Sequence, residues 1–302
     1  MSLALVLVTV GFIAAAFAAA ILAGFLGALF GIGGGIIIVP FLTVFMGIPI
    51  HEGIAISIVS VIATSNAGGS SYVEQRITNI RLAMFLEVAT TAGALVGSFI
   101  ALLLQSWELF MIFTCLLTYM AVISFRTRRT DEARIGTGEF AKVRQDRLAK
   151  YLDLSGVYYD ASAKRNVQYL VTRAPEGSLI SSVAGVVSGL LGVGGGIIKV
   201  SAMNIFMNVP MKAAVATSKF MIGVTAATGA LLFFLAGLVD PYIIAPVALG
   251  TTLGATIGTW VMPRVGSSTL KAAFAVLVAY FAYVMLAQGL ALGFGIQLPV
   301  IG

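Results

Sequence analysis

The sequence predicts an all-α polytopic membrane protein built from two repeats of inverted topology, with about ten membrane segments. Three observations predict this class: the composition, a long internal repeat and the distribution of basic residues. The 302 residues are 59% hydrophobic and only 10% charged, and the mean hydropathy is +1.04. A water-soluble domain needs far less apolar surface to fill its core, so the chain belongs in a lipid bilayer.

The repeat covers most of each half of the chain. Gly24 and Gly185 stand 161 positions apart and open two matching stretches, GFLGALFGIGGGII and GVVSGLLGVGGGII. The same offset aligns Pro49 with Pro210 without a gap. A chance match would drift within a few helical turns. The offset therefore predicts a first transmembrane repeat over residues 1–125 and a second over residues 179–302.

Each half is expected to contain five apolar segments. They span residues 5–30, 36–47, 53–72, 82–104 and 109–125, and then residues 179–191, 197–208, 213–236, 242–262 and 272–291. Several can cross a hydrocarbon core of roughly 30 Å at about 1.5 Å per residue. Those flanking each Gly-Gly-Gly are too short, which predicts half-helices broken at the glycines or a re-entrant hairpin. We favour five spans per half, and three spans plus a hairpin stay an alternative.

Basic residues favour an inverted arrangement of the two halves. Residues 126–178 form a basic, polar insert between the two repeats. If this insert is cytoplasmic and the halves are inverted, every Lys and Arg outside the apolar segments falls on the cytoplasmic side. Parallel halves would instead leave three basic residues outside: Lys212, Arg264 and Lys271. The positive-inside rule therefore predicts inverted repeats and a cytoplasmic insert.

The insert contains the segment LSGVYYDASAKRNVQYLVTR, which resembles two short strands about a turn at residues 160–164. Such a β-hairpin would be a small folded subdomain, a partner-binding element or a polar connector. The sequence does not choose among these three.

The two Gly-x-Gly-Gly-Gly motifs are not phosphate-binding loops, because no Gly-Lys-Ser/Thr follows either of them and no strand precedes them. A helix break inside the membrane leaves backbone amides free at the start of the next helix, where the helix dipole favours an anion. This predicts substrate contacts at the triple glycines: Gly33, Gly34, Gly35, Gly194, Gly195 and Gly196. The alternative is that these glycines only allow close helix packing.

Lys199 and Lys219 lie within apolar segments, where a lysine costs at least about 2.5 kcal/mol on insertion scales. Their segments are joined by a turn near Pro210, 11 positions after Lys199 and 9 before Lys219. In an antiparallel helix pair both lysines therefore fall near the midplane. Their counterparts in the first half are Ile38 and Ile58. This predicts an anion site confined to one half; the alternative is that the lysines snorkel to the surface or pair with a buried carboxylate.

Polar side chains near these lysines are further candidates for the site. Hydroxyl and amide groups that can donate to an oxyanion are Ser57, Ser201, Asn204, Thr217 and Ser218, with Thr64, Ser65 and Asn66 close by. The alternative for each is a bond to its own backbone. Glu87 is a candidate proton-coupling carboxylate, or else a near-interface residue that faces a crevice.

Several functional classes are not expected. No carboxylate pair, metal cluster or nucleophile–base–acid set stands out, so we expect no enzyme activity, no cofactor and no metal site. The net charge of +6 follows from the one-sided gathering of Lys and Arg, so we expect no nucleic-acid partner.

With these motifs in place, the chain resembles the sulfite exporter TauE/SafE family over essentially its whole length except the insert. The resemblance rests on GFLGALFGIGGGIIIVPFL, on GVVSGLLGVGGGIIKVSAMN and on the Ala-Thr-Ser that ends at Ser218. It implies a permease of the bacterial inner membrane that exports sulfite or organosulfonates such as sulfoacetate. Two departures are the length of the insert and Lys199-Val-Ser201, which stands where the first half has Ile38-Val-Pro40.

The expected function is a secondary transporter that exports a small anion by alternating access. Moving one negative charge outward across 100 mV is worth about 2.3 kcal/mol, so the membrane potential can drive export, with proton coupling as an alternative. Rival functions are a channel or facilitator for a small neutral solute, a carrier for another substrate such as a metal ion, and a membrane enzyme or sensor that works through the insert. The exact substrate, the direction of net flux, the coupling ion and the oligomeric state stay open.

Overall fold

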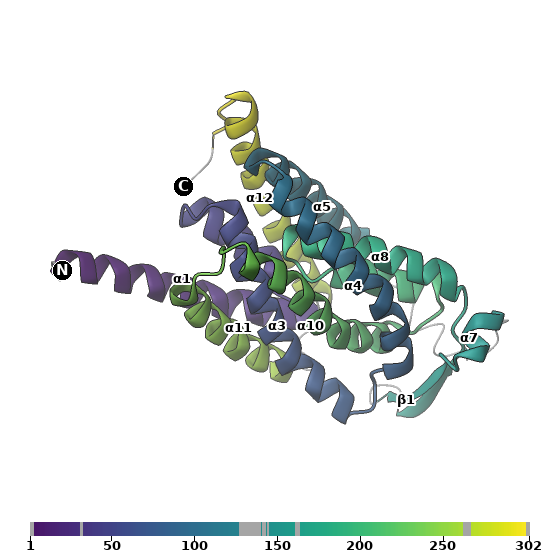
Figure 1. Ribbon diagram of the computed structural model, residues 1–302. Coiled ribbons are helices and arrows are strands. Elements are labelled where there is room, and N and C mark those ends of the chain that lie inside the picture. The colour runs from purple at the N-terminus through teal and green to yellow at the C-terminus, as the bar shows by residue number, and fades with distance from the viewer. Residues whose placement is uncertain are drawn as a thin grey trace.

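The computed structural model describes residues 3–30, 33–126, 140, 143, 145–160, 164–261 and 267–299, and most of them are helical. Long helices pack side by side in one bundle, with a small hairpin and helix α7 at one end (Figure 1). The start of α1 and the end of α12 lie away from that end.

The elements of the first half are α1 (Leu3–Phe30), α2 (Gly35–Pro40), the π-helical turn η1 (Phe41–Phe45), α3 (Ile50–Glu74), α4 (Ile80–Leu103) and α5 (Ser106–Arg126). Those of the second half are α8 (Ala174–Leu191), α9 (Gly196–Ser201), η3 (Ala202–Phe206), α10 (Met211–Leu235), α11 (Pro241–Val261) and α12 (Ser267–Phe294). Between them lie α7 (Arg147–Tyr151), β1 (Gly156–Asp160) and β2 (Arg165–Tyr169).

The repeat in the sequence is also a repeat of structure. The bounds of α9, η3 and α10 are those of α2, η1 and α3 shifted by 161 positions. Pro49 and Pro210 occupy the position before the first residue of α3 and of α10. Both halves contain the π-helical turn, although α2 ends at Pro40 whereas α9 ends at Ser201, the counterpart of Pro40. The turn therefore belongs to the repeated backbone and is not caused by the proline.

The two halves are interlocked through their helix pairs. The first helix of each half packs along the fourth helix of the other, α1 on α11 and α8 on α4, while α3 packs on α10 and α5 on α12. A Cβ added at Gly93 or Gly97 of α4 would collide with backbone atoms of α8, and one at Gly185 or Gly189 would collide with backbone atoms of α4. Small residues at such seams let two helix backbones approach closely within a membrane.

Helices α3 and α10 cross at their midpoints and run antiparallel. Val61 and Ile222, which are equivalent positions of the repeat, both lie against Gly33 and against Gly194. On one side of this crossing Gly68 contacts Lys219, and on the other Gly229 contacts Ile58. Residue numbers thus rise along one helix as they fall along the other.

Seven helices in the described part are long and apolar enough to cross a membrane: Gly11–Leu29, Ile50–Glu74, Ile80–Leu103, Ala174–Leu191, Met211–Leu235, Pro241–Val261 and Ala275–Phe294. Three shorter apolar helices are Gly35–Phe45, Ser106–Val122 and Gly196–Phe206. The prediction of an all-α polytopic membrane protein is thus supported, and the count of ten membrane segments stays a prediction.

Two helices begin five residues before their predicted segments: α12 begins at Ser267 and not at residue 272, and α8 begins at Ala174 and not at residue 179. The sequence predicts a short segment over residues 179–191, whereas α8 has 18 residues and begins at Ala174, inside the predicted insert. Pro175 in the first turn has a backbone angle suited to a helix start, and Glu176 favours the positive end of the helix dipole. A boundary drawn from hydropathy misses this polar first turn.

The insert contains a folded hairpin that packs on the bundle. Strands β1 and β2 pair antiparallel from Gly156 opposite Tyr169 to Asp160 opposite Arg165. Buried residues of the insert share one apolar cluster with α4, η3 and α10: Phe140, Leu154, Tyr158, Val167 and Tyr169 of the insert pack with Leu82, Leu86, Met203, Met207 and Ala213. The described part of the insert is therefore more than a polar connector.

Polar contacts also attach the insert to the starts of two helices of the bundle. At the start of α4, Asn79 Nδ2 donates to the Leu154 carbonyl at 2.7 Å, and Arg81 pairs with Asp153. At the start of α10, Lys212 Nζ lies 2.7 Å from Oδ1 of the buried Asp160. The hairpin thus links α4 to α10.

Candidate functional site

The glycine motifs form two tight turns that meet where α3 and α10 cross. Gly33 and Gly34 have φ of +85° and +78°, and Gly194 and Gly195 have +75° and +63°, which side chains other than glycine rarely adopt. These angles turn the chain sharply, so that α2 and α9 pack back against α1 and α8. The predicted break in the helices is therefore present at both motifs.

Hydroxyl groups hold these turns in place. Ser57 Oγ donates to the Gly192 carbonyl at 2.8 Å, and Thr64 Oγ1 donates to the Gly33 carbonyl at 3.1 Å. Ser218 Oγ donates to the Gly196 carbonyl at 3.4 Å. The hydroxyls of Ser57 and Ser218, which the sequence predicts as anion donors, are therefore used by the protein itself in this conformation.

The glycine turns leave no room for an anion in this structure. All the described glycines of the two motifs are buried. A Cβ at Gly35 would meet the Gly192 carbonyl and Ser57 Oγ, and one at Gly195 would lie 2.6 Å from the Ala184 carbonyl. This geometry matches the alternative in which the glycines allow close helix packing, and anion binding by their amides stays a prediction.

A chain of hydrogen bonds joins Lys199 to Glu87. Lys199 is fully buried on α9, and its Nζ donates to Thr225 Oγ1 of α10 at 2.7 Å. Thr225 Oγ1 in turn lies 2.7 Å from Glu87 Oε1 of α4. Thr91 Oγ1 donates to the same carboxylate oxygen at 3.2 Å. Three elements thus contribute to one buried polar cluster.

Lys219 has no such partner. Its side chain is only 2% exposed, and its Nζ makes no hydrogen bond to any residue that the structure describes. The ammonium lies against Gly68 of α3, where an added Cβ would stand 2.6 Å from Nζ. Neither lysine snorkels to the surface. The other alternative was pairing with a buried carboxylate. Lys199 is linked to Glu87 through Thr225, whereas Lys219 has no such link among the described residues.

The remaining predicted residues lie closer to the turn between α9 and α10. Thr217 is buried, and its Oγ1 accepts a hydrogen bond from the Asn79 amide at 3.0 Å, which joins α10 to the start of α4. Asn204 Nδ2 donates to the Val209 carbonyl at 3.0 Å. Ser201 is half-buried at the end of α9. These hydrogen bonds of Thr217 and Asn204 do not involve either lysine ammonium.

A groove of roughly 780 Å³ opens between α3 and α10, and its lining is mostly apolar. Its polar wall residues are Ser65, Asn66, Ser70 and Glu74 of α3, while α10 contributes Phe220, Gly223, Val224 and Ala227. Ser65 Oγ also donates to the Lys219 carbonyl. The Lys219 backbone therefore touches a residue of the groove wall, while its ammonium lies against Gly68.

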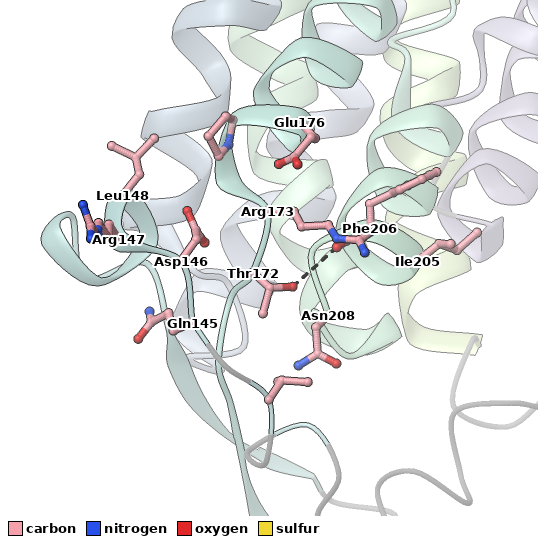
Figure 2. A pocket seen from close by; sticks show the side chains of 12 residues that line it. Gln145, Asp146, Arg147, Leu148, Thr172, Arg173, Glu176, Ile205, Phe206 and Asn208 are labelled. Carbon is pink, nitrogen blue, oxygen red and sulfur yellow. Dashed lines mark hydrogen bonds between the residues drawn. The ribbon is translucent and has the colours of Figure 1, made fainter.

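A second cavity of roughly 880 Å³ lies between the insert and the start of α8. Figure 2 shows Asp146 and Arg147 on the insert side and Arg173 and Glu176 at the start of α8, with Thr172 bonded to the Phe206 carbonyl. Its charged residues are of both signs, and neither Lys199 nor Lys219 lines it. Within the described residues, no group of three His, Cys, Asp or Glu side chains could hold a metal ion.

The sequence analysis missed Thr225, Thr91 and Gly68 as members of the site. A signal for Thr225 was available, because it is the repeat equivalent of Thr64, which was noted as a nearby hydroxyl. No pattern in the sequence points to Gly68, since its role depends on the packing of α3 against α10.

Comparison with known proteins finds one matching family model and two relatives in Bacillus subtilis (strain 168). The family model, described as Sulfite exporter TauE/SafE, matches residues 16–285. A protein named "Probable membrane transporter protein YunE" is 25% identical over 83% of this chain and 88% of its own length. "Probable membrane transporter protein YdhB" is 28% identical over 81% of this chain and 88% of its own length. No solved structure matches.

Proposed function

We propose, from the premise that this chain belongs to the sulfite exporter TauE/SafE family, that it exports a small anion across the bacterial inner membrane as a secondary transporter. Family membership makes it a multi-pass membrane transporter for a small solute. The proposed cargo is sulfite or an organosulfonate such as sulfoacetate. A transporter function agrees with the expectation that the chain is not an enzyme.

The observation that carries the anionic cargo is the unpartnered ammonium of Lys219. A charge removed from water is costly unless an opposite charge or hydrogen-bond acceptors surround it. The described residues supply no acceptor to Lys219 Nζ. A bound anion would supply both the opposite charge and the acceptors, so we propose Lys219 as the main anion contact.

The groove between α3 and α10 supports a route from outside the bundle to this ammonium. Asn66 and Ser70 are exposed on its wall, although they belong to a helix that is apolar enough to cross a membrane. Polar side chains at such positions usually face a water-filled cavity or the inside of the bundle. A small shift of α3 against α10 would open the groove to Lys219.

Lys199 has a different part in the proposal, because its charge is linked to Glu87 through Thr225. We propose that it lies beside the bound anion and raises the local positive charge. The predicted contacts from the glycine turns, Ser57, Ser201, Asn204, Thr217 and Ser218 would require a second conformation, since most of them are engaged within the protein in this one.

Ten membrane segments in two inverted halves, with residues 126–178 in the cytoplasm, are part of the same proposal. The antiparallel contact between the equivalent helices α3 and α10 supports an inverted relation of the halves. The basic residues of the insert support its cytoplasmic side.

In alternating access, the moving bodies would then be helix pairs that each contain one helix from either half. Because α1 is packed on α11 and α8 on α4 through glycine seams, each pair is expected to move as one body about the crossing of α3 and α10. The membrane potential favours outward movement of a negative charge by about 2.3 kcal/mol per 100 mV.

The test is ligand-dependent thermal stabilisation of the purified protein by sulfite, sulfoacetate, isethionate, taurine and sulfate. Stabilisation by the anions that is lost in Lys219→Ala supports the proposal. Stabilisation by none of them, or equal stabilisation of wild type, Lys199→Ala and Lys219→Ala, contradicts it.

A further inference from the structure

We propose that Glu87 takes up a proton when a divalent oxyanion binds at Lys219, so that one proton accompanies each anion. This inference rests on the proposed function and adds to it a coupling ion and a charge class of substrate. It is carried by the buried cluster of Glu87, Thr225 and Lys199 and by the unpartnered ammonium of Lys219 on the same helix as Thr225.

Comparison of the two halves indicates that these charges are not needed for folding. The repeat equivalents of Lys199, Thr225 and Glu87 are Ile38, Thr64 and Ala248. At that position the threonine is kept and bonds to the Gly33 carbonyl, while Ile38 packs in an apolar contact with α1 and α11. Replacing a buried ion pair by apolar residues is often neutral or stabilising. The first half thus forms the same arrangement of helices without these charges.

The hydrogen bonds of the cluster suit a carboxylate that gains and loses a proton. The Thr225 hydroxyl accepts from the Lys199 ammonium and can donate its own hydrogen to Glu87 Oε1. Together with Thr91, these donors can hydrogen-bond the carboxylate form of Glu87. Glu87 Oε2 is buried and has no hydrogen-bond partner among the described residues. This oxygen is the atom on which the proton would bind.

Few other charged or titratable groups on the elements around α4 can act on Glu87. Those elements contribute Glu176 on α8, Lys199 on α9, and Lys212 and Lys219 on α10. The described part of the insert contributes Asp146, Arg147, Lys150, Tyr151, Asp153, Tyr158, Tyr159, Asp160, Lys164, Arg165, Tyr169 and Arg173. Glu176 is exposed in the first turn of α8, Lys212 is paired with Asp160, and Asp153 with Arg81. Within the described residues, Lys199 is the one among them that a chain of hydrogen bonds joins to Glu87.

The charges balance for a divalent anion. With Glu87 ionised, the three buried groups sum to one positive charge. When a proton converts the Glu87 carboxylate to the neutral acid, Lys199 and Lys219 leave two positive charges, which a divalent anion cancels. For such an anion with one proton, one net negative charge still crosses the membrane, so the potential can drive its export.

Proton and anion binding therefore favour each other, and the coupling is reciprocal. Thr225 lies six residues beyond Lys219 on α10, which is about 9 Å along the helix axis. If the anion and Glu87 are separated by about this distance, each anion charge favours protonation of Glu87 by a factor on the order of ten at an effective dielectric constant of about 20. A divalent anion is thus expected to take up more of a proton than a monovalent anion.

The test uses sulfoacetate and isethionate, two sulfonates of similar size that carry two charges and one. Their binding to the full-length purified protein is measured at pH 8 by titration calorimetry in Tris and in Bis-Tris propane, which are not sulfonates and differ in ionisation enthalpy. The dependence of the observed heat on the buffer gives the number of protons taken up. We expect measurable proton uptake with sulfoacetate and a smaller uptake with isethionate.

Variants separate the cluster from the anion contact. Glu87→Gln should take up no proton and bind sulfoacetate at least tenfold more tightly, because its neutral side chain mimics the protonated acid. Thr225→Val should reduce proton uptake, and Thr225→Ser should restore it. Glu176→Gln, which removes an exposed carboxylate of α8, is the matched control and should leave proton uptake unchanged.

The outcomes distinguish this inference from the function on which it rests. Sulfoacetate binding without proton uptake by the wild type, or uptake that persists in Glu87→Gln, overturns the inference and leaves an anion transporter. Absence of binding by both sulfonates overturns the inference, and absence of binding by sulfite as well overturns the function too.

Discussion

The contact between Gly68 and the Lys219 ammonium predicts that a single methyl group on α3 weakens anion binding without harming the fold. A Cβ at Gly68 would lie 2.6 Å from Nζ, 3.1 Å from Cδ and 3.4 Å from Cε of Lys219. All three atoms belong to a flexible side chain. In Gly68→Ala the ammonium must therefore retreat, while the backbones of α3 and α10 keep their positions.

The size of the effect follows from the distance that the ammonium has to move. Ordinary contact with a Cβ begins at 3.4 Å, so Nζ must shift by about 0.8 Å. If the anion stays in place, its distance to Nζ grows from about 2.9 Å to about 3.7 Å. At an effective dielectric constant of about 20 this costs about 1.2 kcal/mol, or about eightfold in the dissociation constant.

Gly69→Ala is the matched control for this prediction. The neighbouring Gly69 has its closest atoms at 3.7 Å and 3.8 Å, all of them backbone atoms of Lys219 and Phe220, so a methyl group fits there. Alanine also has the higher helix propensity, so neither variant should lose thermal stability. Calorimetric binding of sulfoacetate to the two variants gives the comparison. Equal affinities for Gly68→Ala, Gly69→Ala and wild type would refute the placement of the anion at Lys219.

Three further predictions concern the fold. Gly97→Ala should lower the unfolding free energy by about 1–3 kcal/mol, because its Cβ meets the Val186 backbone, whereas Gly11→Ala, with nothing within 4 Å, should be close to neutral; thermal unfolding in detergent compares them. Asp160→Asn should loosen the insert and speed its cleavage by trypsin, because it weakens a buried partner of Lys212, whereas Asp153→Asn removes only an exposed pair and should change little. Burial raises the pKa of Tyr169 to about 12 from 10.0, against an opposing hydrogen bond from Asn79. The stabilisation of the fold by the neutral Tyr169 is therefore complete below pH 10 and is lost as the pH rises towards 12, a loss of about 2–3 kcal/mol in the free energy of unfolding. Alkaline unfolding of Tyr169→Phe should lack this loss.

Much of the architecture could be predicted because local sequence patterns determine it. Long apolar runs require helices in lipid. An offset of 161 positions without gaps fixes which helices correspond, and the bounds of α10 are those of α3 shifted by this offset. The start of α8 could not be placed from hydropathy, since its first turn is polar. The pairing of α1 with α11 and of α8 with α4 is a contact between halves that a repeat alone does not specify.

The site was only partly predictable for the same reason. The sequence alone identifies Lys199 and Lys219 as lysines in apolar segments, and both are buried in the structure. The difference between them is tertiary, because α4 and α10 come from different halves and bring Glu87 and Thr225 to Lys199 alone. Likewise the Ser57 hydroxyl can donate to the Gly192 carbonyl only when the two glycine turns meet. The sequence alone could not show that this hydroxyl already has a hydrogen-bond partner.

The central claim is that the buried ammonium of Lys219 binds a small anion that the protein moves across the membrane. Its most direct test is the flux of radiolabelled sulfoacetate in proteoliposomes that contain wild type or Lys219→Met, at equal amounts of folded protein. The account predicts sulfoacetate flux through the wild type that falls to the level of empty liposomes in Lys219→Met. Flux that is equal in both proteins, or no flux of sulfoacetate or sulfite through the wild type, would contradict it.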